Sequence, residues 1–264
     1  MKIALVQVAS PDTESRDDRI TRVEEILRTL GNVDLIVLPE LWSTGYFHFE
    51  QNDELAETQD GPTITMCSKV AADLGVHIHL GSIVERTEDG KLKNTSMLID
   101  PTGKIIHEFS KLHIFGYKSK EIDLLTAGDK LAVVATPFGN VVGTTCYDLR
   151  FPGLWMEISD RKADMVIVPA AWPATRREHW RLLTSARAVE HQIFVVAVNA
   201  VGTQTGSELG GYSRVVDPAG NVLGECGNSE QVLIVDLDPA QVVEVRKEFP
   251  VINDRLASYA GLAN

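Results

Sequence analysis

Short apolar runs alternate with longer amphipathic stretches along this chain of 264 residues, a pattern typical of an α/β fold. The runs are rich in Ile, Val and Leu, and they predict strands at residues 3–8, 35–38, 77–84, 97–99, 105–109, 141–145, 165–168, 194–198, 215–216 and 222–223. Two turn sequences, residues 100–103 (Asp-Pro-Thr-Gly) and 217–220 (Asp-Pro-Ala-Gly), each separate a pair of these strands and predict hairpins.

Four amphipathic stretches predict helices. Asp17 and Asp18 can cap the first helix, and Gly31 is placed to end it. The second helix should start near Pro62 and stop at Gly75, because proline suits a first helical turn and glycine suits a C-terminal cap. The other two helices are expected at about residues 154–162 and 177–191.

Two segments of the chain match almost letter by letter. Residues 34–42 (Asp-Leu-Ile-Val-Leu-Pro-Glu-Leu-Trp) match residues 164–172 (Asp-Met-Val-Ile-Val-Pro-Ala-Ala-Trp), and the two Asp-Pro-x-Gly turns follow in the same order. Such ordered matches indicate an internal duplication. Two similar βαβαβ halves predict two mixed sheets packed together with helices outside. We therefore expect a four-layer α-β-β-α sandwich formed by a single domain, residues 1–264.

Each matched segment lies at the end of a predicted strand. We expect both strand ends at one rim of the sheets, where the sites of α/β proteins usually lie. At the matched position the first half carries Glu40 and the second half carries Ala170. A carboxylate kept in only one half is what an enzyme with a single site would need.

The charge balance narrows the classes of partner. Lys and Arg number 25 against 37 Asp and Glu, a net charge of −12, which disfavours nucleic acids and anionic membranes. No 18 apolar residues run together, and the N-terminal apolar run is too short for a secretory signal. Three cysteines are too few for a disulfide framework, and an odd number cannot all pair with one another. We therefore expect a cytoplasmic protein in a reducing compartment, with no membrane partner.

Common cofactor and nucleophile signatures are absent from the sequence. It has no glycine-rich nucleotide motif, no Gly-x-Ser-x-Gly elbow and no His-Glu-x-x-His. His77 and His79 share a strand face, but no cysteine or carboxylate is placed to complete a metal site, so packed or surface histidines are favoured. Cys67 and Cys226 are interpreted as packing residues.

Cys146 differs from the other two cysteines in its position. It ends an apolar strand and is followed at once by Tyr-Asp-Leu-Arg-Phe-Pro. A strand that stops abruptly and turns into a helix presents the sulfur on a rim, with backbone N–H groups converging near it. This local pattern alone leaves a buried structural cysteine as the alternative.

Several short motifs, taken in order, resemble the nitrilase superfamily of carbon–nitrogen hydrolases over nearly the whole chain. They are Glu40 after Val-Leu-Pro, Lys111-Leu-His, Cys146-Tyr-Asp-Leu-Arg-Phe-Pro, Trp172-Pro, Arg187-Ala-Val-Glu and Phe249-Pro. The resemblance implies that Cys146 is the nucleophile, Glu40 the general base, Lys111 the oxyanion partner and Glu121 the family's second glutamate. It also implies a homodimer that uses helices and the C-terminal segment, residues 239–264.

These residue types suit cofactor-free amide hydrolysis. A free thiol with a pKa of about 8.5 is only a few per cent ionised at neutral pH, so it needs a base such as Glu40. Glu40 would pass the proton to the leaving amine and later activate water against the thioester. Lys111 and the Tyr147 N–H would stabilise the tetrahedral oxyanion, and Glu121 would orient Lys111 or the substrate amide.

Within the superfamily, Cys-Tyr-Asp-Leu-Arg-Phe-Pro and Pro-Ala-Ala-Trp-Pro look most like the omega-amidase branch, which hydrolyses 2-oxoglutaramate and related dicarboxylic monoamides. A deaminated-glutathione amidase, an aliphatic amidase and an N-carbamoyl-amino-acid hydrolase are the enzyme alternatives. A binding or regulatory subunit with the same fold is the non-enzyme alternative, and the intact Glu40, Lys111 and Cys146 argue against it.

A substrate with a free carboxylate needs a cation in the pocket. Arg150, four residues after Cys146, is the first candidate, and an ion pair with Asp148 or the helix end is the structural alternative. Arg176 and Arg177 are further candidates. Aromatic side chains are expected to wall the pocket, namely Tyr46, Phe47 and Trp172, and Tyr147 is a further substrate-binding candidate.

Overall fold

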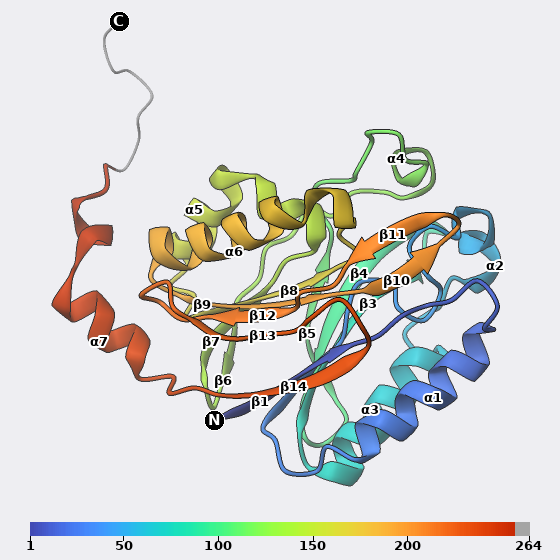
Figure 1. Cartoon of the computed structure of the whole chain (residues 1–264), viewed down its shortest axis with the longest axis horizontal. Helices are drawn as coiled ribbons and strands as arrows, with labels where there is room; N and C mark the ends of the chain where they lie inside the picture. The colour runs from blue at the N-terminus through green and yellow to red at the C-terminus, as the bar shows by residue number, and fades with distance from the viewer. Residues whose placement is uncertain (257–264) are drawn as a thin grey trace, which may run out of the picture.

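Two six-stranded mixed sheets form the centre of the molecule, a computed structural model that describes residues 1–256 (Figure 1). The first sheet has the strand order β14-β1-β2-β3-β4-β5, and the second has the order β13-β12-β9-β8-β7-β6. A separate two-stranded ribbon consists of β10 and β11. The strands are β1 (Lys2–Gln7), β2 (Leu35–Val37), β3 (His77–Arg86), β4 (Leu92–Ile99), β5 (Ile105–Ser110), β6 (Val134–Thr136), β7 (Gly139–Gly143), β8 (Met165–Ala170), β9 (Phe194–Asn199), β10 (Val201–Gln204), β11 (Ser207–Gly210), β12 (Arg214–Val216), β13 (Val222–Glu225) and β14 (Gln231–Asp236).

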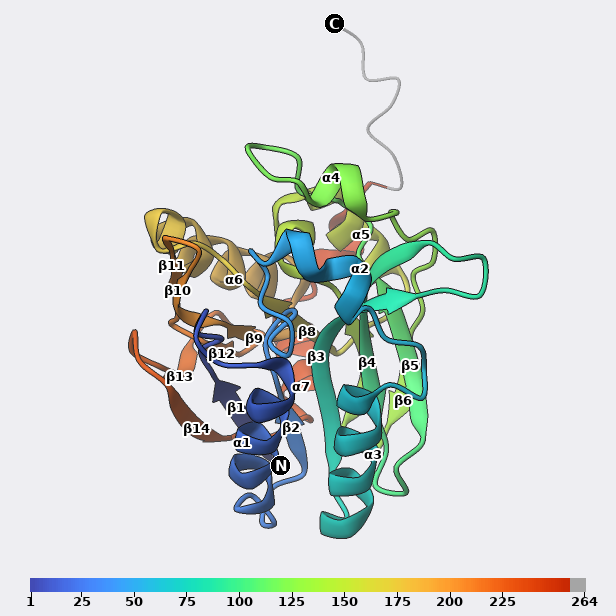
Figure 2. The ribbon, with the colours of Figure 1, turned by 90° about the vertical axis from the view of Figure 1, so that its right-hand side faces the viewer.

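Helices cover the outer face of each sheet and complete the predicted four layers (Figure 2). Helices α1 (Arg16–Arg28) and α3 (Pro62–Leu74) pack on the first sheet, and α5 (Pro152–Asp160) and α6 (Arg177–His191) pack on the second. The other helices are α2 (Asn52–Leu55), α4 (Glu121–Leu124) and α7 (Gln241–Glu248), with 3-10 helices η1 (Phe49–Gln51), η2 (Cys146–Arg150), η3 (Ala174–Arg176) and η4 (Val251–Asp254).

Strand alternation decides which side chains enter which layer. In β1, Ile3 and Leu5 belong to the core between the sheets, while Ala4 and Val6 belong to the core under α1 and α3. Both faces of the central strands are therefore buried, which explains why these strands read as continuous apolar runs in the sequence.

The predicted duplication is present in both topology and turn chemistry. The order β14-β1-β2-β3-β4-β5 corresponds strand by strand to β6-β7-β8-β9-β12-β13, with three parallel strands in each. Asp34 accepts a hydrogen bond from the Lys2 N–H, and Asp164 accepts one from the Asn140 N–H. The turns at Asp100 and Asp217 repeat each other as well, because each carboxylate accepts the N–H groups two and four residues on.

The predicted caps of the first helix were wrong. Ser15, not Asp17 or Asp18, caps α1, and its Oγ accepts the Asp18 N–H at 3.2 Å. The helix also stops before Gly31. Serine is a favoured N-cap residue because its short side-chain hydroxyl reaches the free N–H groups of the first helical turn.

Strand limits also differ from the prediction. The strand predicted at 141–145 spans Gly139–Gly143 instead, because the chain turns into η2 at Cys146. Strands β6, β10, β11 and β14 were not predicted. The ribbon strands β10 and β11 carry a mixed polar pattern, whereas β6 and β14 are apolar edge strands that the prediction overlooked.

The C-terminal segment 239–264 forms α7 and η4 as far as the structure describes it. Residues 257–264 of that segment lie outside the described residues, and its place at a dimer interface stays a prediction. Within residues 1–256, no helix has the length and apolar character needed to cross a membrane.

Candidate active site

Cys146 lies on a tight backbone turn between β7 and η2. Its φ of 48° is in the left-handed region, which costs a non-glycine residue on the order of 1 kcal/mol. Asp148 holds this turn, because its carboxylate accepts the Thr145 N–H at 3.1 Å and both the N–H and Nδ1 of His113, at 3.0 and 2.7 Å. The turn places Cys146 at a pocket, as the sequence predicts.

Lys111 lies between the carboxylates of Glu40 and Glu121, and all three side chains are buried. Glu40 follows β2, Lys111 follows β5 and Glu121 begins α4. The Lys111 Nζ donates to Oε1 of Glu40 at 2.9 Å and to the two Glu121 oxygens at 2.8 and 3.1 Å. Residues far apart in the sequence therefore form one charged cluster.

Neighbouring donors fix the orientation of both carboxylates. Oε1 of Glu40 also accepts the Asn94 side-chain amide, and Oε2 accepts the Ala171 N–H, both at 2.8 Å. Oε2 of Glu121 accepts the Tyr46 hydroxyl at 2.8 Å and the Phe115 N–H at 3.0 Å. Hydrogen bonds on every oxygen leave neither carboxylate free to rotate.

Gly81 in β3 allows the chain that carries Glu40 to approach closely. Its φ is 76°, and a Cβ at this position would lie 1.9 Å from the Pro39 carbonyl oxygen. Only glycine avoids this overlap, so a side chain here would displace the turn that positions Glu40.

The surrounding charges set the protonation of Cys146 and Lys111. Burial and the Glu40 carboxylate raise the pKa of the Cys146 thiol well above its usual value, and Lys111 opposes them only in part. Burial alone would lower the pKa of Lys111, but Glu40 and Glu121 outweigh it and hold that pKa well above its usual value. At rest the site holds a neutral thiol beside a charged lysine, so the thiol needs a base to react.

Cys146 opens onto a cavity of about 470 Å³ with largely aromatic walls. The walls include Tyr46, Phe47, Phe115, Tyr117, Tyr147 and Trp172, and the polar lining includes Lys118, Arg150, Arg176 and Glu208. A volume of this size fits a small molecule, and the few polar groups can orient it.

Arg150 does not form the ion pair with Asp148 that was the structural alternative, because His113 and Thr145 occupy that carboxylate. Its guanidinium instead lies over the Trp172 ring, 4.4 Å from the centroid. Burial and the nearby charge of Arg176 lower the pKa of Arg150. Among the residues that the structure describes, neither of these neighbouring guanidinium groups pairs with a carboxylate, which favours an anionic ligand.

Arg176 lines the same cavity and lies 5.7 Å from the Tyr117 ring centroid. Arg177 is not among the residues that line it. Its Nε donates to the Gly210 carbonyl and its guanidinium lies over the Tyr212 ring, so it has a packing role.

Comparison with known proteins places this geometry in a family. The sequence model described as carbon-nitrogen hydrolase matches residues 2–247. The chain belongs to the carbon–nitrogen hydrolase family. A 2-oxoglutaramate amidase of Paenarthrobacter nicotinovorans is 39% identical over 264 residues, which cover 97% of this chain and 90% of the relative.

Two solved structures are similar to this carbon–nitrogen hydrolase along their whole length. XC1258 of Xanthomonas campestris, described as a CN-hydrolase superfamily protein with an arsenic adduct in its active site, has a TM-score of 0.90 and 31% identity, covering 99% of both chains. Nit3 of Saccharomyces cerevisiae, described as a nitrilase superfamily member, has a TM-score of 0.84 and 29% identity, covering 99% of this chain and 97% of its own. The predicted superfamily and fold are confirmed.

Sequence reasoning missed several residues of the hydrolase that orient others. Asn94 and Ala171 hold Glu40, and Asp148 holds the turn at Cys146. Asn199, buried at the end of β9, accepts the Trp172 N–H at 2.6 Å and donates to the Trp172 carbonyl at 3.2 Å. A polar residue that ends an otherwise apolar strand was the available signal for Asn199.

The remaining candidates lie away from this cluster. His77 and His79 are packed in β3, as predicted, and within residues 1–256 neither nitrogen of His79 has a hydrogen-bond partner. Cys67 and Cys226 are buried, and burial raises the pKa of both thiols, that of Cys226 to about 12. In the described part of the chain, no group of three or more His, Cys, Asp or Glu side chains is arranged to hold a metal ion.

Proposed function

We propose that this hydrolase is a cofactor-free thiol amidase that cleaves the C–N bond of a small carboxylated amide, such as 2-oxoglutaramate, and releases ammonia. The proposal rests on two features that meet at Cys146. Cys146 adjoins the buried Glu40–Lys111–Glu121 cluster, and the cavity into which it opens carries Arg150 and Arg176. The name of the relative with 39% identity supports the same substrate class.

Acylation begins with transfer of the thiol proton from Cys146 to Glu40. The thiolate attacks the amide carbonyl carbon, and the carbonyl oxygen takes up the negative charge of the tetrahedral intermediate. Glu40 then returns the proton to the amide nitrogen as the C–N bond breaks, so that ammonia leaves and a thioester remains on Cys146. Nucleophile, base and acid are all supplied by the chain, so the step requires no cofactor.

Deacylation uses the same base against water. Glu40 takes a proton from a water molecule that attacks the thioester carbonyl, the C–S bond breaks, and the thiolate of Cys146 recovers the proton. The carboxylic acid product gives its remaining proton to solvent and leaves as its anion. One carboxyl group serves both half-reactions because its two oxygens are held in place by Lys111, Asn94 and Ala171.

Lys111 is the proposed electrostatic partner of the oxyanion, with the Tyr147 N–H as a second donor. Loss of one such donor typically costs about 3 kcal/mol of transition-state stabilisation. Glu121 is proposed to hold Lys111 and keep it charged, since it accepts two hydrogen bonds from Nζ. Tyr46 and Trp172 are proposed to wall the substrate chain.

Arg150 and Arg176 are the proposed partners of the substrate carboxylate. Both line the cavity, and Trp172 supports the Arg150 guanidinium from one face. An arginine fork can bind a carboxylate through two parallel hydrogen bonds, which a single lysine cannot do.

A substrate screen with ammonia detection tests the proposal. We expect release of ammonia from 2-oxoglutaramate and succinamate, and a mass on Cys146 that corresponds to the acyl group. Turnover confined to neutral short amides would indicate an aliphatic amidase, and turnover confined to ureido acids would indicate an N-carbamoyl hydrolase. Turnover of only a larger peptide-like amide would indicate a deaminated-glutathione amidase. Binding without turnover of any amide would indicate a regulatory subunit.

We further propose that the 264 residues form one catalytic domain, that the protein is a homodimer, and that it resides in the cytoplasm. The described part of the C-terminal segment, residues 239–256, leaves apolar side chains exposed, including Val243 and Phe249, which a partner copy would cover. A reducing compartment would keep the Cys146 thiol free. Light scattering tests the dimer, and a fluorescent fusion in intact cells tests the location.

A further inference from the structure

The turn that follows Glu40, residues 41–45, begins with a strained residue. Leu41 has a φ of 45°, in the left-handed region that residues with a Cβ rarely adopt. Its N–H donates to the Ser82 Oγ at 3.1 Å, and its carbonyl accepts the Gly45 N–H at 2.7 Å. Strain of this kind persists only where the surrounding structure holds it. The bend lies directly after Glu40, so it helps to fix the backbone from which that side chain extends.

Two side chains from the start of the chain hold the carbonyl groups of this turn. Ser10, in the connection between β1 and α1, donates from Oγ to the Trp42 carbonyl at 2.7 Å. Arg19, in the first turn of α1, donates from Nη1 to the Ser43 carbonyl, also at 2.7 Å. Trp42 and Ser43 are completely buried, and within residues 1–256 no other group donates to either carbonyl. Loss of either donor would leave a buried carbonyl oxygen unpaired, which is unfavourable.

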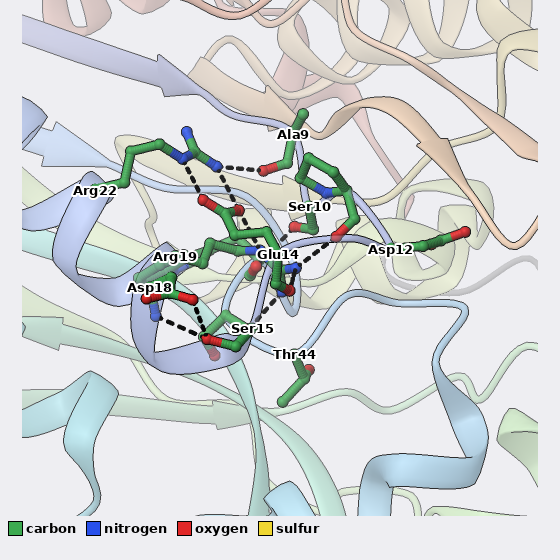
Figure 3. Close-up of polar contacts among 12 residues, drawn as sticks. Ala9, Ser10, Asp12, Glu14, Ser15, Asp18, Arg19, Arg22 and Thr44 are labelled. Carbon is green, nitrogen blue, oxygen red and sulfur yellow. Dashed lines mark hydrogen bonds and ion pairs between the residues drawn. The ribbon is translucent and has the colours of Figure 1, made fainter.

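The Arg19 guanidinium is itself held by the connection that precedes it (Figure 3). Its side chain is 1% exposed. Nη2 donates to the carbonyl oxygens of Pro11 and Glu14, at 3.0 and 2.9 Å, and Nε donates to the Glu14 carboxylate at 3.1 Å. A guanidinium is planar, so bonds on two of its nitrogens fix the direction of the third. Contacts that do not involve the turn therefore aim Nη1 at the Ser43 carbonyl.

Arg22, one turn further along α1, supports the same connection without a bond to the turn after Glu40. It donates to the two Glu14 carboxylate oxygens, at 2.6 and 2.9 Å, and to the Ala9 carbonyl at 3.1 Å (Figure 3). In the described part of the chain, none of its hydrogen bonds reaches residues 41–45. Arg22 is thus a matched comparison for the other arginine, because both bind the same carboxylate.

We propose that Arg19, with Ser10 as a second support, is a positioning residue that holds the turn after Glu40 and, through it, the Glu40 carboxylate. This role rests on the proposed function, in which Glu40 is the base of both half-reactions. Without Arg19 a buried carbonyl of the turn loses its donor, and the strain at Leu41 can relax. The Glu40 carboxylate then moves away from the donors that orient it. Proton transfer slows, because a base works only within hydrogen-bond reach of the proton that it takes.

Substrate binding should change less than the chemical step. Tyr46 and Phe47 follow the turn and line the cavity, but each has an anchor of its own. The Tyr46 hydroxyl donates to Glu121 at 2.8 Å. The Phe47 N–H donates to the Gln204 side chain at 3.2 Å. We therefore expect loss of the support to lower kcat with little change in KM.

Amide hydrogen exchange, followed by nuclear magnetic resonance, tests the placement of Glu40 without any substrate. The Ala171 N–H donates to Glu40 Oε2, whereas the Ala200 N–H donates to the last carbonyl of β8, both at 2.8 Å. Arg19→Gln should speed exchange at Ala171 relative to Ala200 by about tenfold. Arg22→Gln should leave that ratio at its wild-type value. Equal acceleration of the two amides, or the same rise of the ratio in both variants, would overturn the proposal.

Kinetics test the consequence, with the best amide from the substrate screen as the probe. Arg19→Gln should lower kcat about 30-fold with KM within about twofold of wild type, and Arg22→Gln should keep the wild-type kcat. Circular dichroism shows that both variants are folded at the assay temperature. A raised KM with an unchanged kcat would exclude the positioning role. A changed exchange ratio with unchanged kcat and KM would support the placement of Glu40 and contradict Glu40 as the base, so the two proposals fail separately.

Ser10→Ala provides the same test if Arg19→Gln does not fold, since it removes a single hydroxyl. The Trp42 carbonyl loses its donor, so kcat should fall and exchange at Ala171 should rise, each by about fivefold. Ser15→Ala is the matched control, because its hydroxyl caps α1 instead. Changes in Ser10→Ala no larger than those in the control would contradict the support of the turn by this connection.

Discussion

The Ala171 N–H donates a hydrogen bond of 2.8 Å to Oε2 of Glu40. The two residues come from the matched turns that follow β8 and β2 in the duplicated halves. One half supplies the carboxylate, and the other supplies the backbone donor that orients it. The difference between Glu40 and Ala170 therefore has a structural counterpart, because the packing of one half against the other positions the Glu40 carboxylate.

Replacement of Glu40 by Gln should reduce kcat by about a thousandfold, because the amide cannot take a proton from the thiol or from water. Glutamine has the same shape and can still accept the Ala171 N–H, so the variant should fold. Single-turnover ammonia release separates the two half-reactions. We expect no ammonia burst. A burst of one equivalent followed by a halt would mean that Glu40 acts in deacylation only.

Arg150→Ala should raise KM for a carboxylated amide about 30-fold and leave KM for a neutral amide of similar length nearly unchanged. The reason is that a charged hydrogen-bond partner of the carboxylate is lost. Arg150→Lys should recover only part of the affinity, because an ammonium cannot lie flat over Trp172 as the guanidinium does. An equal rise for both amides would identify Arg150 as a purely structural residue.

Asn199→Ala should lower the free energy of unfolding by about 3 kcal/mol, because it leaves the Trp172 N–H buried without a partner and removes one of the two hydrogen bonds to the Trp172 carbonyl, which keeps only the bond from the Gly210 N–H. Urea unfolding measures the change. Ser213→Ala is the matched control, since it removes a buried hydroxyl of the same network that bonds Gln7 and Asn199 without touching Trp172. A loss of unfolding free energy no larger than that of the control would mean that the hydrogen bonds from Asn199 to Trp172 do not stabilise the fold.

The positions of Cys146 and Glu40 at the site could be predicted from the sequence, whereas the residues that orient them could not. Cys146 and Glu40 each end an apolar strand, and such ends meet at one rim when a sheet is buried on both faces. Ala171 contributes only its backbone, so no side-chain pattern marks it. Asn94 and Asn199 act through contacts between strands that are distant in sequence. Those contacts depend on how the two sheets pack, which no local pattern encodes.

The stability of the fold should fall as the solution is made acidic, and His79 provides the clearest reason. Burial lowers the pKa of His79 from 6.5 to about 3, and neither ring nitrogen has a hydrogen-bond partner in the described part of the chain. Below pH 6.5 the unfolded chain binds a proton that the folded chain does not, so stability is lost from there down to about pH 3.

For His79 alone this loss amounts to about 2 kcal/mol between about pH 7 and about pH 5. Urea unfolding at those two pH values measures it. His79→Leu has no ring to protonate, so its stability should fall less between them than that of the wild type. His191, whose pKa burial lowers to about 4, remains in both proteins and contributes equally to each. An equal loss in wild type and His79→Leu would mean that His79 is not the group whose protonation drives acid unfolding.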